Sequence, residues 1–166
     1  MSNGKLQVFI SSKMRKDSLQ AERDAAVKAV KMSGLKPWHW ETCGYAASYP
    51  PMEICLEAVQ NSDILILLLG YDLTKHTREE HQTAVRLEIP DFIFVKHGRL
   101  KKETRDYLAG HENRVTHMEF KSISELKTII ARSLSKEIAR GYRSGRSPRI
   151  GTRASYSSGS RGRRNG

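Results

Sequence analysis

Polar side chains that could do chemistry occur in four short segments of the sequence. These segments combine hydroxyls, carboxylates, a guanidinium group and flexible glycines: Ser11-Ser12-Lys13-Met14-Arg15, Glu41-Thr42-Cys43-Gly44-Tyr45, Gly70-Tyr71-Asp72-Leu73-Thr74 and Thr77-Arg78-Glu79-Glu80. The first three follow short, mostly apolar runs typical of strands, and the fourth begins a helical pattern. In an open parallel sheet, ligands bind beyond the carboxyl ends of the strands. These segments therefore predict a site that could hold a ribose or a nucleotide.

Established catalytic and nucleotide-binding motifs are absent from the sequence. It contains no GxGxxG, no GxxxxGK[ST], no HExxH and no GxSxG. The six histidines show no metal-ligand spacing with the cysteines. These absences argue against an ATPase, a zinc hydrolase and an α/β-hydrolase. We expect no metal and no cofactor, so a nucleotide would be the substrate.

The elements that must position these segments are strands and helices in regular alternation. Strand patterns lie at residues 6–10, 35–40, 64–69, 92–95 and 115–120. Helical patterns lie at 17–33, 51–60, 77–87, 101–109 and from 122 to about 140. The unbroken apolar run at 64–69 is typical of a strand covered on both faces. The alternation predicts a mainly parallel, five-stranded sheet between two layers of helices, and Pro37 favours an edge position for the second strand.

Charge is distributed unevenly along the 166 residues, which carry a net charge of +11. Residues 140–166 contain eight arginines and no acidic residue, which leaves 21 basic and 18 acidic residues in the remainder. This segment is also rich in Gly and Ser, a composition that cannot bury a core. We predict one α/β domain at 1–139 and a disordered basic tail at 140–166. The tail could bind RNA or another polyanion, or serve only as a solubilising tail or linker.

Cysteine content and apolar run lengths bear on location. Cys43 and Cys55 form neither a disulfide framework nor a CxxC pair, which favours a reducing compartment. The first apolar run, of about four residues, is shorter than the ~7–15 of a signal peptide. The run at 64–69 is far shorter than the ~18–20 residues of a membrane span. We expect a soluble, cytoplasmic protein with no membrane partner.

Four stretches of the sequence resemble a known family. They are VFISSKMRKDSLQAERDAAVKAV (8–30), MEICLEAVQNSDILILLLG (52–70), TREEHQTA (77–84) and IPDFIFVK (89–96). Taken in order, they resemble the TIR-like domain of unknown function often found N-terminal to signalling NTPase modules, over roughly residues 5 to 97. The resemblance implies a flavodoxin-like, TIR-like three-layer sandwich, the fold of TIR domains and nucleoside 2-deoxyribosyltransferases.

The resemblance also assigns roles within the four segments. Several enzymes of the wider group cleave an N-glycosidic bond in NAD or in a deoxynucleoside. The deoxyribosyltransferases carry Thr-x-x-Glu-x-x-x-Ala at a helix start, and the match at 77–84 gives Glu80 the catalytic position. The resemblance also implies that the segment after the first strand lies near a bound nucleotide. The candidate substrate-binding residues are Ser11, Ser12, Arg15, Glu41, Gly70, Tyr71, Asp72 and Thr77.

Structural interpretations compete with these roles. Thr77-x-x-Glu80 also fits a capping box, in which Glu80 would accept a hydrogen bond from the Thr77 amide. Trp38 and Trp40 would lie on one side of the predicted strand, either packed or stacked on a base. Glu22-Arg23 could form a charged site, but the pair favours a solvated helix face or a structural salt bridge.

Three functional hypotheses remain open at this level. The leading one is a nucleotide-binding domain, an NAD glycohydrolase or a deoxyribosyltransferase-like hydrolase, in which Glu80 is the nucleophile or stabilises positive charge on the sugar. The second is a non-catalytic signalling module that self-associates into homo-oligomers. The third is RNA binding through the basic tail.

Overall fold

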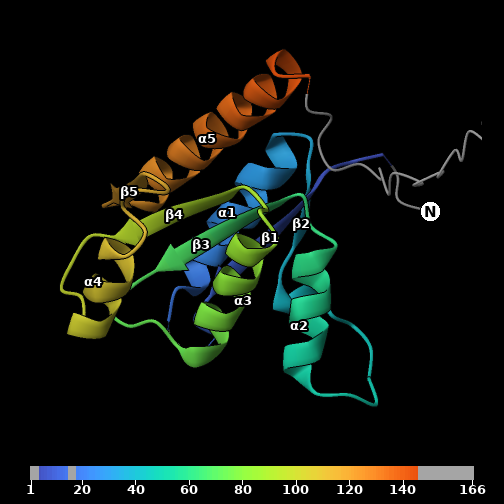
Figure 1. Cartoon of the computed structure of the whole chain (residues 1–166), viewed down its shortest axis with the longest axis horizontal. Coiled ribbons are helices and arrows are strands. Elements are labelled where there is room, and N and C mark those ends of the chain that lie inside the picture. The colour runs from blue at the N-terminus through green and yellow to red at the C-terminus, as the bar shows by residue number, and fades with distance from the viewer. Residues whose placement is uncertain (1–3, 15–17, 146–166) are drawn as a thin grey trace, which may run out of the picture.

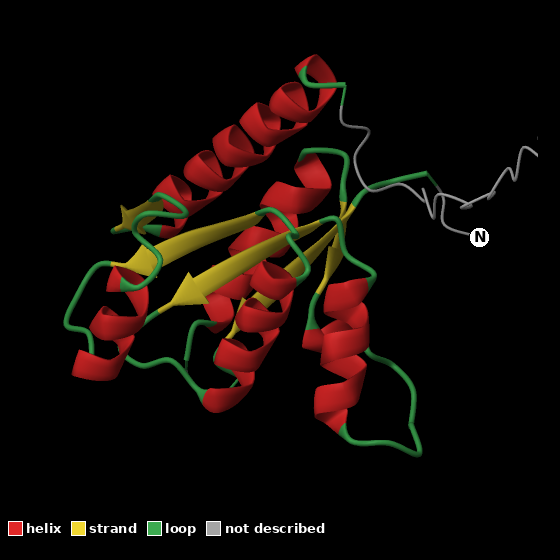
Figure 2. Ribbon diagram, in the orientation of Figure 1, coloured by secondary structure: helices red, strands yellow, loops and turns green. Residues whose placement is uncertain are grey.

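The computed structural model describes residues 4–14 and 18–145. Five parallel strands form one sheet in the order β2 (Lys36–Trp38), β1 (Gln7–Ser12), β3 (Ile64–Leu69), β4 (Asp91–Lys96) and β5 (His117–Phe120). The helices are α1 (Gln20–Met32), α2 (Pro51–Gln60), α3 (Lys75–Arg86), α4 (Lys102–Ala109) and α5 (Ile123–Arg143), with a 3₁₀ turn η1 (Trp40–Thr42). Helices cover both faces of the sheet (Figures 1 and 2). The predicted flavodoxin-like α/β fold is confirmed, including the edge position of β2.

Strand β3 lies at the centre of the sheet, and all six of its residues are buried. Because side chains alternate along a strand, Ile64, Ile66 and Leu68 join the cluster formed with α1 and α5. Leu65, Leu67 and Leu69 join the opposite cluster, formed with α2, α3 and α4. The uninterrupted apolar run is therefore the consequence of a strand that is covered on both sides.

Helix α3 begins one residue after Thr74, earlier than the sequence pattern predicts. The Thr74 hydroxyl caps the helix by accepting a hydrogen bond from the Thr77 amide at 3.3 Å. Glu80 accepts a hydrogen bond from the Ser11 hydroxyl on β1 instead of reaching back to Thr77. The capping-box interpretation of Thr77 and Glu80 is wrong, because Thr74 can serve as the cap and leaves Glu80 in the second turn.

The ends of the neighbouring elements also differ in detail from the sequence pattern. Helix α1 ends where expected, because Gly34 adopts φ 78°, a left-handed conformation that suits glycine at a helix C-terminus. Strand β2 is shorter than expected and ends at Trp38, and the chain then turns into η1 at Trp40. The two tryptophans therefore lie on different elements, not on one side of a single strand.

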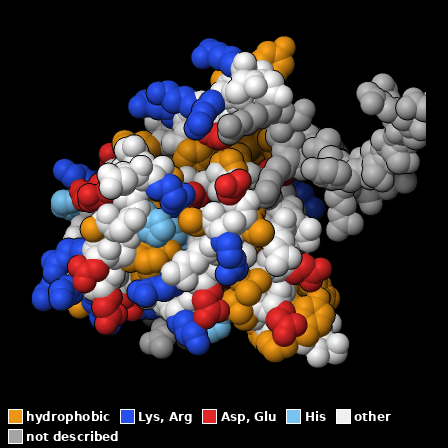
Figure 3. Space-filling model, viewed as in Figure 1, with side chains coloured by type: hydrophobic (Ala, Val, Ile, Leu, Met, Phe, Trp, Pro, Cys, Tyr) orange, Lys and Arg blue, Asp and Glu red, His pale blue; other side chains and the backbone are white. Residues whose placement is uncertain are grey.

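Helix α5 continues past the predicted boundary at residue 139 and ends at Arg143. Residues 140–143, assigned to the tail from composition, are thus helical, while 146–166 lie outside the described residues and their predicted disorder stays a prediction. On the face seen in Figure 3, basic and acidic side chains are interspersed across the described surface. Among the described helices, none is long and apolar enough to cross a membrane.

Candidate active site

The carboxyl end of β1 and the second turn of α3 bring a hydroxyl and a carboxylate together. Ser11 and Phe9 lie on the face of β1 that α3 covers, so the Ser11 hydroxyl donates a hydrogen bond to Glu80 Oε2. Both side chains are buried, with Ser11 at 0% and Glu80 at 8% exposure. The next residue, Ser12, points to the opposite face, where Arg23 of α1 donates to its hydroxyl at 3.2 Å.

A cavity of about 540 Å³ opens beside this carboxylate. Its volume falls within the ~300–1,000 Å³ typical of small-molecule sites. The lining is aromatic and apolar on one side and polar on the α3 side, and its residues are Phe9, Ile10, Ser12, Met14, Trp38, Trp40, Pro51, Cys55, Thr74, Lys75, His76, Thr77 and Glu80. The cavity lies at the carboxyl ends of β1 and β2, the edge of the sheet where sequence analysis predicts the site.

Burial controls the protonation of the Glu80 carboxyl. Removal from water raises its pKa to about 7, an effect only partly offset by hydrogen bonds from Ser11 and Cys55. The Cys55 thiol is also buried and faces the Glu80 carboxylate, so its pKa rises to about 12. Near neutral pH, Glu80 therefore exists in both protonation states, whereas Cys55 remains a neutral thiol.

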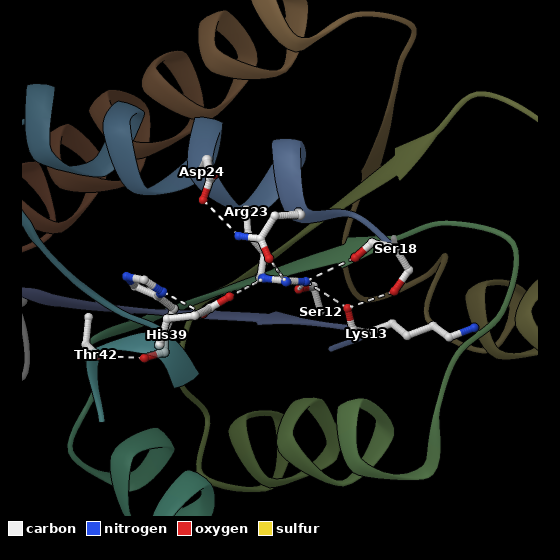
Figure 4. A network of polar contacts seen from close by, with 9 residues as sticks. Ser12, Lys13, Ser18, Arg23, Asp24, His39 and Thr42 are labelled. Atoms are coloured by element: carbon white, nitrogen blue, oxygen red, sulfur yellow. Dashed lines mark hydrogen bonds and ion pairs between the residues drawn. The ribbon is translucent and has the colours of Figure 1, made fainter. Parts of the chain in front are cut away.

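Arg23 links the ends of β1 and β2 next to the cavity (Figure 4). Its guanidinium bonds the Ser12 hydroxyl and, through Nε, Glu41 Oε1 at 3.0 Å. The other oxygen of Glu41 pairs with His39 Nδ1 at 2.7 Å. The carboxylate of Glu41 is thus held by two side chains, and this pairing with His39 and Arg23 lowers its pKa against the opposing effect of burial.

The structure brings some of the predicted site residues together. Ser12, Thr77 and Glu80 line the cavity, and Ser11 contacts Glu80. Thr77 is 3% exposed, and its hydroxyl shares a hydrogen bond of 2.9 Å with the hydroxyl of Thr74.

Other predicted site residues lie outside the cavity lining. Asp72 Oδ1 accepts a hydrogen bond from Lys13 Nζ at 2.6 Å, and the exposed ring of Tyr71 faces Lys101. Neither Gly70 nor Glu41 belongs to the lining. Arg15 lies outside the described residues. Glu41 and Asp72, which follow β2 and β3, thus form ion pairs beside the site, whereas Trp40 and Thr74 from the same connections line it.

Several lining residues are not among the candidate substrate-binding residues predicted from the sequence. Cys55 has the spacing of an ordinary apolar position on α2, and Thr74, Lys75 and His76 fall in a predicted loop. A stronger preference for Thr74 as the helix cap would have placed the latter three at the start of α3, next to Glu80. Trp38 and Trp40 do line the cavity, and Trp38 also stacks on Phe9 with ring centroids 4.7 Å apart.

A second polar cluster, around the buried His81 and Asp91, lies on the other side of α3. His81 Nε2 and Asp91 Oδ2 lie 2.6 Å apart, and Arg114 binds both Asp91 oxygens at 2.5 and 2.8 Å. Tyr107 of α4 reaches the other ring nitrogen of His81 at 2.6 Å. Every partner is engaged, so this cluster ties α3 to β4 and α4.

Among the described residues, no group of three His, Cys, Asp or Glu side chains could hold a metal ion.

Solved structures share this fold at low sequence identity. BlsM is 17% identical with a TM-score of 0.63, covering 84% of this chain and 95% of BlsM. The CMP N-glycosidase BcmB of Clostridium botulinum is 14% identical with a TM-score of 0.56, covering 79% of this chain and 98% of BcmB. A 2-deoxyribosyltransferase of Bacillus psychrosaccharolyticus is 12% identical with a TM-score of 0.54, covering 73% and 90%. At these identities the likeness shows the fold alone.

Sequence comparison identifies the family directly. No curated protein matches the chain significantly. Residues 7–140, which span all five strands and reach into α5, match the family described as Domain of unknown function (DUF4062), and the chain belongs to that family.

Proposed function

We propose that this protein cleaves the N-glycosidic bond of a nucleoside, a nucleotide or NAD, with Glu80 as the catalytic carboxylate. One observation carries the proposal: a buried carboxylate, fixed by a serine hydroxyl, lines a cavity with aromatic walls at the carboxyl ends of parallel strands. Ligands of open α/β sheets bind at this edge. The supporting comparisons are the fold neighbours named above for a CMP N-glycosidase and a 2-deoxyribosyltransferase.

The reaction needs a group that interacts with positive charge on the sugar. As the C1′–N bond breaks, its electron pair leaves with the base and positive charge develops on the ribose. The Glu80 carboxylate stabilises that charge or forms a bond to C1′, in the manner of retaining glycosidases. Water then supplies the hydroxyl group on C1′. From a nucleoside or nucleotide its proton goes to the departing base, whereas from NAD, whose nicotinamide leaves as a neutral base, the proton goes to the solvent. The products are a free base and a free sugar, a sugar phosphate or, from NAD, ADP-ribose.

The walls of the cavity suit the other parts of such a substrate. The indole rings of Trp38 and Trp40 offer flat apolar surfaces on which a base can stack, an interaction worth ~1–3 kcal/mol per base. On the α3 side, Thr74, Thr77 and Glu80 line the cavity with polar groups that can bond sugar hydroxyls. The cavity thus divides into an aromatic half for the base and a polar half for the sugar.

The pKa of Glu80 gives the proposal a pH signature. Only the carboxylate form can attack C1′ or stabilise an oxocarbenium-like sugar. Since its pKa is about 7, that form accumulates as pH rises from 6 to 8. Base release should therefore increase with pH through the neutral range and level off above it.

The test is release of free base, measured by chromatography, from CMP, deoxynucleosides, ribonucleosides and NAD. We expect at least one of these compounds to be cleaved by the wild type and not by Glu80→Gln, which retains the shape of the side chain. Unchanged compounds at every protein concentration would overturn the proposal for these substrates. Concentration-dependent assembly without turnover would instead favour the self-association module, and salt-sensitive RNA binding that is lost on deletion of 146–166 would favour the basic tail.

A further inference from the structure

Arg23 is buried and donates more hydrogen bonds than a surface salt bridge requires. Its side chain is only 3% exposed, although it is one of the longest and most polar in proteins. The guanidinium donates to the Ser12 hydroxyl, to the backbone carbonyls of Lys13 and Ser18, and to Glu41. Gln20 Oε1 takes a further bond at 2.6 Å. Figure 4 shows the guanidinium reaching from α1 towards the end of β1 on one side and towards His39 on the other.

These partners belong to two segments that line the cavity, one after β1 and one after β2. Ser12 and the segment after it, which includes Met14, form the wall that follows β1. Glu41 lies in η1, directly after Trp40, and this turn forms the wall that follows β2. Beyond Phe9, the two strands are no longer paired. Arg23 therefore spans the walls at the point where the sheet no longer holds them together.

We propose that Arg23 is a positioning residue that holds the Trp38–Trp40 wall and the Ser12–Met14 wall at the separation that a nucleotide requires. The inference rests on the proposed function for the identity of the ligand. The hydrogen bonds of Arg23 to both walls, here called the Arg23 clamp, do not depend on that function. Arg23 does not line the cavity and does not contact Glu80. It acts on the substrate through the two walls.

The chemistry of arginine explains why this residue type can hold two segments of the chain together. Its planar group offers five N–H donors in a fixed fork, so one side chain can hold several acceptors on different segments. A lysine keeps the charge but has a single nitrogen, which cannot reach both Lys13 O and Glu41 in the same geometry. Arg23→Lys should therefore release one wall without removing the charge.

The tryptophans provide a readout that needs no substrate. The chain has only two, and both line the cavity, so fluorescence excited at 295 nm reports on this wall alone. We expect acrylamide to quench this fluorescence more strongly in Arg23→Lys and in Glu41→Ala than in the wild type. The matched control is Glu22→Gln, which breaks the 2.6 Å ion pair to Lys96 at the neighbouring buried position of α1, away from the cavity. Its quenching should equal that of the wild type.

Steady-state kinetics connect the clamp to the ligand. For a substrate that the wild type cleaves, we expect KM to rise about tenfold in both clamp variants, a change of ~1.4 kcal/mol in binding. kcat should stay within about threefold, because Ser11 and Glu80 keep their contact. Thermal melting of each variant separates this effect from a general loss of folded protein, which lowers the active fraction and leaves KM unchanged.

The outcomes separate this inference from the proposed function. If the wild type cleaves no nucleotide, the proposed function fails, and the fluorescence comparison still decides whether Arg23 holds the wall. Equal quenching in Arg23→Lys, Glu41→Ala and Glu22→Gln would overturn the clamp. Stronger quenching together with an unchanged KM would overturn its role in binding.

Discussion

Replacing Glu80 with Gln should change the pH dependence of stability in a direction that the burial of Glu80 dictates. In the folded protein the pKa of this carboxyl is about 7, against an ordinary value of 4.5. The folded state therefore holds the proton more tightly than the unfolded state. Stability from this source is fully present below pH 4.5 and is lost as pH rises to about 7. Glutamine has no titratable proton, so Glu80→Gln should not lose this stability as pH rises.

The magnitude follows from the separation of the two pKa values, about 2.5 pH units. Each unit corresponds to ~1.4 kcal/mol, so the free energy of unfolding of the wild type should fall by about 3 kcal/mol relative to the variant between pH 4 and pH 8. This is a substantial part of the ~5–15 kcal/mol that stabilises an ordinary domain. An uncharged side chain at this position would avoid this pH-dependent cost.

Urea unfolding of the wild type and the variant at a series of pH values measures this difference. The curve of stability difference against pH should rise through pH 5–7 and flatten above pH 8. The matched control, Glu79→Gln, removes a neighbouring carboxylate that is more exposed and pairs with Lys75 at 3.8 Å. Such a surface pair is worth less than ~1 kcal/mol. A difference between wild type and Glu80→Gln that does not change with pH would refute the reasoning.

Three further predictions follow from named contacts. Ser11→Ala removes a hydrogen bond that lowers the pKa of Glu80. Because a bond to a charged group is worth ~1.5–3 kcal/mol, the pH midpoint of base release should move up by about one unit. An unmoved midpoint would contradict this prediction. Asp91→Asn leaves Arg114 without its carboxylate and should cost about 3 kcal/mol in urea unfolding at pH 7. Because the pKa of Asp91 in the folded protein is lowered to about 2, the stability difference between the wild type and Asp91→Asn should decrease only below pH 4. A difference that has already decreased at pH 6 would contradict this prediction. Leu67→Ala, at a position with 0% exposure in the central strand, should cost about 3 kcal/mol, and a change under 1 kcal/mol would show that this side of the sheet is loosely packed.

Sequence alone could predict the sheet because the signals there are local. The run at 64–69 has six residues and none is polar, which favours a strand covered on both faces over a longer helix. Gly34 marks the end of α1 through its freedom at positive φ. Helix α3 shows the limit of such signals. Thr74 and Thr77 are both good caps, and only tertiary contacts decide that Thr74 caps the helix and that Glu80 bonds to Ser11.

The candidate site was predictable only in part, for a similar reason. Ser11, Ser12 and Glu80 could be placed because strand ends and helix starts converge at one edge of a parallel sheet. The part played by Arg23 could not, since its partners lie between 3 and 18 residues away and four of the five are backbone or uncharged groups. For the same reason Glu41 could not be recognised as the partner of an arginine.

We propose that Glu80 makes this domain a glycosidic-bond enzyme, and the rate of base release by matched variants tests this proposal most directly. Wild type, Glu80→Gln and Glu79→Gln should be compared at pH 8, at equal folded concentration, on the best substrate of the panel. We predict that Glu80→Gln loses at least ~100-fold in rate while Glu79→Gln keeps the wild-type rate. Equal rates for wild type and Glu80→Gln would contradict it.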